Sequence, residues 1–140
     1  MRRLTLLLVT STIASCIMPL GDSARDYSIN QEYFVGWIDD PSYRSINKGH
    51  SDSNIFSIIV EPYIFSVGHN DDFIIAKQFG GQGVRGLTVD TTKTAFYIID
   101  ISENHPREIV YGPLSETEFD NLRIRFGIEK ITFNKTFPLN

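Results

Sequence analysis

Two runs of aromatic and β-branched residues constrain the fold of this chain most strongly. Residues 73–79 (FIIAKQF) and 95–101 (AFYIIDI) have the length and composition of β-strands. Residues 33–38 (YFVGWI) form a third such run, which stops at the turn-forming residues 39–42 (DDPS). Runs of this kind joined by hairpin-length loops predict a mainly antiparallel sheet.

The remaining strand signals are weaker. Residues 54–67 are too many for one strand, and Pro62 cannot donate a ladder hydrogen bond, so we expect an edge, a bend or a break between two strands there. Residues 43–47 predict a short strand and residues 131–137 a terminal one. Residues 80–86 (GGQGVRG) contain four glycines and predict a loop.

A capping box predicts one helix over about residues 115–126. Ser115 is followed three positions later by Glu118, so each can satisfy a free backbone N–H group at the helix start. An apolar stripe follows and ends at Gly127, a residue suited to a left-handed C-cap; its members are Phe119, Leu122 and Phe126. The sequence therefore predicts an α+β fold with a mainly antiparallel sheet and one C-terminal amphipathic helix.

The N-terminus predicts export. Residues 1–3 are a basic start, residues 4–9 an apolar run, and Ile13-Ala14-Ser15 places small residues before Cys16. This series resembles the lipobox of bacterial lipoproteins. The resemblance implies cleavage between Ser15 and Cys16, with diacylglyceryl and palmitate chains on the new N-terminal cysteine. Residues 4–20 are too interrupted by polar residues for a membrane-spanning helix, which needs ~20 predominantly apolar residues.

The expected organisation has three parts. Residues 1–15 are a signal peptide, residues 16–27 a lipidated cysteine with a flexible tether, and residues 28–140 a single globular domain. The lipobox resemblance implies a cell-envelope protein held to a membrane through Cys16. In a Gram-negative host that membrane would be the outer membrane, with the protein facing the periplasm.

Composition excludes several kinds of chemistry. Without Arg2 and Arg3, the chain has a formal charge of −6 and no cluster of basic residues, so we expect no nucleic-acid partner. Cys16 is the only cysteine, so disulfides, thiolate metal sites and cysteine nucleophiles are not expected once it is acylated. No spacing typical of a metal or cofactor site occurs, and we expect neither.

Three residues are candidates for a hydrolase: Glu61, His69 and Asp100. Such an enzyme would need at least two of them in one concave pocket. Alternation places Asp100 on the strand face of Phe96 and Ile98, and we expect it to reach solvent at the strand end. His69 begins a polar turn whose Asn and Asp side chains we expect to bond their own backbone rather than a cation.

The segments FIIAKQ, AFYIID and GPLSETEF resemble a family of small bacterial lipoprotein domains with no assigned function, over roughly residues 28–128. The family supplies no catalytic residue, and we expect a non-catalytic protein. Tyr and Trp are frequent at binding hot spots, as is Arg, so Trp37, Tyr43 and Arg44 form the expected contact surface. The leading hypothesis is an adaptor or inhibitor that binds another envelope protein. Alternatives are a small-ligand or glycan-binding module and, third, a small hydrolase.

Overall fold

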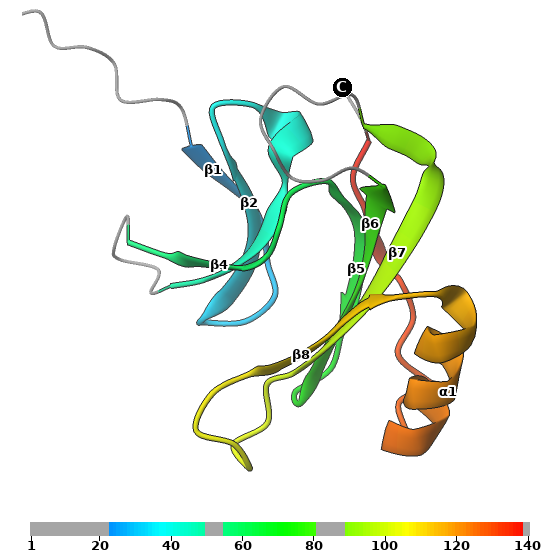
Figure 1. Ribbon diagram of the computed structural model, residues 1–140. Coiled ribbons are helices and arrows are strands. Elements are labelled where there is room, and N and C mark those ends of the chain that lie inside the picture. The colour runs from blue at the N-terminus through cyan, green and yellow to red at the C-terminus, as the bar shows by residue number, and fades with distance from the viewer. Residues whose placement is uncertain (1–22, 50–54, 81–88, 139–140) are drawn as a thin grey trace, which may run out of the picture.

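Figure 1 shows the computed structural model of the protein, which describes residues 23–49, 55–80 and 89–138. Within these ranges the chain forms two antiparallel sheets and one α-helix, the combination expected of an α+β fold. The strand order is β1-β2-β3-β4 in the first sheet and β8-β7-β6-β5-β9 in the second.

The two sheets follow one another along the chain. The first contains β1 (Ser23–Ser28), β2 (Tyr33–Ile38), β3 (Ser45–Lys48) and β4 (Ser57–Val60), with a short 3-10 helix, η1 (Pro41–Tyr43), before β3. The second contains β5 (Ile64–His69), β6 (Phe73–Gly80), β7 (Asp90–Asp100), β8 (Ile109–Leu114) and β9 (Lys135–Thr136). The helix α1 (Glu116–Phe126) lies between β8 and β9 in the chain.

Alternation along the strands builds two cores. On β6, Ile74 and Ala76 pack into the core between the sheets, whereas Ile75 packs on the opposite side. Because successive side chains point to opposite faces of a strand, the second sheet is buried on both faces. The first sheet contributes to the shared core the buried side chains of Tyr33, Val35, Ile46 and Val60.

The helix α1 covers the outer face of the second sheet (Figure 1). Phe119 anchors it: this side chain is 2% exposed, and its ring centroid lies 4.9 Å from that of Phe96. The predicted capping box is confirmed, since the Ser115 hydroxyl accepts from the backbone N–H of Glu118 and the Glu118 carboxylate accepts from that of Ser115. Gly127 ends the helix with φ 67°.

The chain passes from the first sheet to the second at Pro62, where the sequence predicted a break. Tyr63 has a φ of 80°, in the left-handed region. The side-chain amide of Gln78 donates to the carbonyl oxygens of Glu61 at 2.9 Å and Pro62 at 3.0 Å, so the crossing keeps its backbone acceptors satisfied. Of the alternatives expected at Pro62, the structure shows the break between two strands, β4 and β5.

The strand β1 departs from the expected organisation. We expected residues 16–27 to include a flexible tether up to the domain, but Ser23–Ser28 pair with β2, with Ser23 opposite Ile38 and Ser28 opposite Phe34. This strand reads SARDYS and lies at the edge of its sheet, where charged residues are common. Backbone pairing holds this strand without an alternating apolar pattern, so no strand signal is present in its residues.

Three smaller differences complete the comparison. The strand β8 was not expected, and the terminal strand expected over residues 131–137 consists of Lys135–Thr136 alone. The glycine-rich segment 80–86 lies outside the described residues except for Gly80, which ends β6.

In the parts of the chain that the structure describes, no helix is both long and apolar enough to cross a membrane.

Candidate functional site

Three connections meet at one end of the two sheets and surround an open cleft of about 670 Å³. They are the β1–β2 connection, the β5–β6 turn and the loop 101–108 between β7 and β8. The backbone N–H of Ile101 donates to the carbonyl of Asp72 at 2.8 Å, which joins the second and third of them. Apart from Tyr33, Ile101 and Pro106, the side chains that line the cleft are polar or charged.

A hydrogen-bonded network joins the two sheets at this cleft. One carboxylate oxygen of Glu108 accepts from the Lys48 ammonium at 2.9 Å and from the Tyr33 hydroxyl at 3.0 Å. The Lys48 ammonium also lies 3.7 Å from the carboxylate of Glu32. Lys48 ends β3 and Tyr33 begins β2, whereas Glu108 comes from the loop before β8. The network therefore connects the first sheet to the second.

The protonation states in this network support one another. Burial alone would raise the pKa of the Glu108 carboxyl, but hydrogen bonds from Lys48, a backbone N–H and Tyr33 outweigh it and hold this pKa below its ordinary value. The bond to Glu108 raises the pKa of the Lys48 ammonium. Burial raises the pKa of the Tyr33 phenol. At neutral pH the network thus consists of a carboxylate, an ammonium and a neutral phenol.

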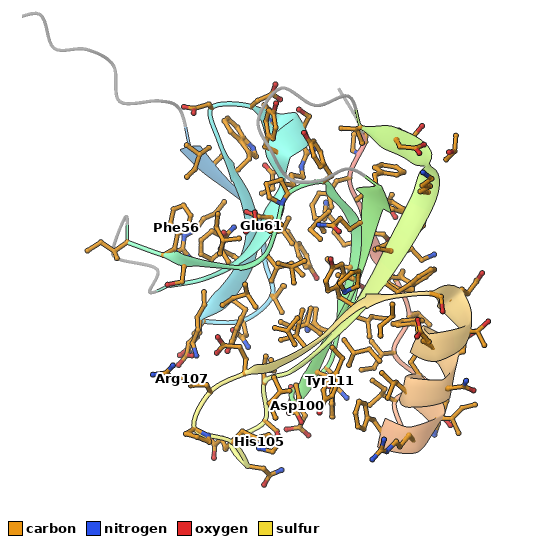
Figure 2. The ribbon with its side chains drawn as sticks, in the orientation of Figure 1. Phe56, Glu61, Asp100, His105, Arg107 and Tyr111 are labelled. Atoms are coloured by element: carbon orange, nitrogen blue, oxygen red, sulfur yellow. The ribbon has the colours of Figure 1, made fainter. Side chains whose placement is uncertain are left out.

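The expectation that Asp100 reaches solvent at the strand end is wrong, because this residue is only 9% exposed. Its Oδ1 atom accepts from the backbone N–H of Ser102 at 2.9 Å and from the Ser102 hydroxyl at 2.6 Å. Its Oδ2 atom lies 3.4 Å from His105 Nε2, and Figure 2 shows the two side chains together at the loop 101–108. In a serine hydrolase the histidine lies between hydroxyl and carboxylate. Here the carboxylate lies between Ser102 and His105, so the Ser102 hydroxyl is bonded to the carboxylate and not to the imidazole that would have to take its proton.

The structure does not bring the three hydrolase candidates together. The Nε2 atom of His69 lies 3.2 Å from the hydroxyl of Tyr27, on the first sheet. Glu61 is exposed at the crossing between the sheets, away from Asp100 (Figure 2). None of the three lines the cleft.

The polar turn after His69 is stabilised as the sequence predicted. The side-chain oxygen of Asn70 accepts from the backbone N–H groups of Asp72 at 3.0 Å and Phe73 at 2.7 Å. This turn closes on its own backbone. Among the described residues, no group of three or more His, Cys, Asp or Glu side chains has the arrangement of a metal site.

The expected contact surface contains two side chains that share one carboxylate. Asp26 on β1 accepts from Trp37 Nε1 at 3.1 Å and from Arg44 Nε at 2.5 Å. Arg44 is 8% exposed and also donates to the carbonyl of Pro138 at 3.1 Å. Tyr43 is half-buried, with its ring centroid 5.4 Å from that of Tyr63. Arg44 therefore holds β1 and the C-terminal segment in place and offers little surface to a partner.

Sequence reasoning missed the network of Tyr33, Lys48 and Glu108. Glu108 stands 60 positions from Lys48 and 75 from Tyr33, and no local pattern relates them. The one available signal was a carboxylate directly before an apolar run, Glu108 before Ile109, and such residues are common at solvated strand ends.

Together the described residues define a small α+β domain: two packed antiparallel sheets, one covering helix and a polar cleft at one end. The chain belongs to the DUF3997 family, described as "Protein of unknown function", which matches residues 30–137. Comparison with curated proteins and with solved structures gives no match. The family match covers most of the expected domain and assigns it no activity.

Proposed function

We propose that this protein is a non-catalytic cell-envelope domain, anchored to a membrane through lipids on Cys16, that binds another envelope protein at the cleft. The anchor is supported by the basic start, apolar run and small residues that precede Cys16. Two or more acyl chains give stable anchoring. In a Gram-negative host the protein would face the periplasm from the outer membrane.

The chemistry of the cleft lining is the observation that carries the binding role. Pockets for small molecules are lined mainly by apolar and aromatic side chains. This cleft has polar and charged walls, and Tyr33, the one Phe, Tyr or Trp among its described lining residues, is 4% exposed and engaged with Glu108. An open, polar surface of this kind suits the polar surface of another protein better than a small apolar ligand or a stacked sugar ring.

The charges of the cleft favour a basic partner segment. Five lining residues carry carboxylates, two carry permanent positive charges, and one of those two, Lys48, is already engaged by Glu108 and Glu32. The lining acids are Glu32, Asp71, Asp72, Glu103 and Glu108, and the second cation is Arg107. Complementary charge contributes specificity and association rate at such a surface.

The anchor is tested by labelling cells with a clickable fatty acid. We expect label on the wild-type chain and none on Cys16→Ala. A labelled Cys16→Ala chain, or an unlabelled wild type, would contradict the anchor.

The binding role is tested by crosslinking the anchored protein in its membrane and identifying captured proteins by mass spectrometry. We expect one near-stoichiometric partner that is lost with Glu103→Lys in the cleft. Glu129→Lys makes the same charge change at an exposed site after α1 and should keep the partner. Equal capture by both variants would contradict binding at the cleft. Capture of background proteins alone would contradict a stable protein partner and would favour the alternatives of a ligand-binding module or an enzyme.

A further inference from the structure

The connection between the proposed lipid anchor and the domain is short. Residues 17–22 separate Cys16 from Ser23, the first residue of β1. An extended chain covers at most about 3.6 Å per residue, so these seven steps hold Ser23 within about 25 Å of Cys16. This upper bound does not depend on how the residues between them are arranged.

The first two strands give the domain a direction relative to that attachment. Ser23 pairs with Ile38 at one end of β2, and η1 follows directly. Ser28 pairs with Phe34 near the other end, where the β1–β2 connection enters the lining of the cleft. At about 3.4 Å per residue, the ends of β2 lie about 17 Å apart.

The cleft lies at the end of the domain away from Ser23. In Figure 1 the start of β1 and the cyan η1 lie at the top, and the yellow loop 101–108 extends past the β1–β2 connection at the bottom. For the cleft to face the lipid, residues 17–22 would have to span more than the ~17 Å length of β2 alongside the domain, out of a reach of about 25 Å. Such a chain has few conformations, so this orientation carries an entropic cost.

We infer that the domain stands with η1 and the start of β1 nearest the membrane and presents its cleft away from the membrane, to a protein in the aqueous compartment. This inference rests on the lipid anchor of the proposed function. It also separates two surfaces: Trp37 and Tyr43, expected from sequence to contact a partner, lie at the membrane-proximal end. The cleft is then the surface that a partner from the aqueous side meets first.

Energy transfer to the membrane surface tests this orientation. Cys16 is the only cysteine, and its acylated sulfur does not react with maleimides, so an added cysteine is labelled alone. We would make Ile38→Cys, at a 39% exposed position beside Ser23, and Glu103→Cys, at an exposed position of the cleft. Each mature lipidated protein, beginning at Cys16, would carry a donor dye in vesicles with an acceptor dye on the lipid headgroups.

We expect clearly stronger transfer from the label at Ile38 than from the label at Glu103. A second cleft position, Asn104→Cys, guards against local perturbation by the label and should match Glu103→Cys. Equal transfer from both ends, or stronger transfer from the cleft, would overturn the orientation while leaving the anchor intact. Ile38→Cys combined with Cys16→Ala is the control without lipid, and we expect it not to float with vesicles. If the protein that retains Cys16 also fails to float, both the anchor and the orientation are contradicted.

Discussion

Lys48 and Glu108 lie 60 positions apart in the sequence, and the ammonium of one donates to the carboxylate of the other at 2.9 Å. Lys48 belongs to the first sheet and Glu108 to the loop that enters β8, so this bond connects the two packed sheets at the end where the cleft lies. The Tyr33 hydroxyl donates to the same oxygen at 3.0 Å. These three residues line the proposed binding site and also connect the two sheets. Substituting them should therefore change the stability of the domain, which can be measured.

Glu108→Gln should lower the free energy of unfolding by about 1–2 kcal/mol, because it removes a charge-assisted hydrogen bond whose carboxylate side chain is 17% exposed. Urea unfolding followed by Trp37 fluorescence measures this change. Glu32→Gln is the matched control, since its carboxylate is 54% exposed and 3.7 Å from Lys48; we expect a loss below about 0.5 kcal/mol. Equal losses in the two variants would mean that the buried bond contributes nothing beyond a surface pair.

The same carboxylate should make stability depend on acidity. The pKa of Glu108 is lowered in the folded protein from its ordinary 4.5, so below neutral pH the unfolded chain binds this proton first. Its contribution is therefore present above pH 4.5 and is lost as the pH falls through the lowered pKa. Unfolding free energies measured from pH 7 to pH 3 should fall more steeply in the wild type than in Glu108→Gln. Parallel curves would contradict this assignment.

Arg44→Met should destabilise the protein by about 2–4 kcal/mol, because it leaves Asp26 without its guanidinium partner and releases Pro138. Trp37→Phe removes the indole N–H bond to the same carboxylate and a small part of a half-buried ring, and we expect a loss of about 1 kcal/mol. Thermal unfolding of both variants gives the comparison. A fully stable Arg44→Met chain would restore Arg44 as a candidate for partner contact.

Ser115→Ala should cost about 1 kcal/mol, because the first turn of α1 loses its side-chain acceptor and the partner of Glu118. Thr117→Ala, two positions later on the exposed side of the same turn, should leave stability unchanged or raise it slightly, since alanine is the better helix former. Urea unfolding distinguishes the two. A loss in Thr117→Ala as large as that in Ser115→Ala would show that the cap has no special part.

The elements that the sequence predicted well are those whose signals are local. The aromatic and β-branched runs of β6 and β7, the break at Pro62 and the capping box at Ser115 each depend on neighbours within a few positions. The strand β1 escaped prediction because backbone pairing with β2 holds an edge strand that lacks an apolar pattern. Fold class followed from the first group alone.

The candidate site was much less predictable, because distant segments build it. The expectation that Asp100 would reach solvent was wrong because the loop 101–108 folds back and supplies Ser102 and His105 as partners. Arg44, expected at a surface, is buried by a carboxylate that stands 18 positions earlier, in a segment expected to be tether. The Arg44–Asp26 pairing depends on β1 joining the first sheet, and the bonds from Lys48 and Tyr33 to Glu108 depend on how the two sheets pack. No short motif records either arrangement.

The pairing of β1 with β2 also has a mechanical consequence. If the membrane holds the chain at Ser23 and a partner pulls on the cleft, the pull runs along β1 rather than across it. All the hydrogen bonds between β1 and β2 then resist the pull at once, in shear, whereas a perpendicular pull would unzip them one after another. The force needed to separate β1 from β2 would therefore be higher along the line between the membrane tether and a bound partner than across the strands.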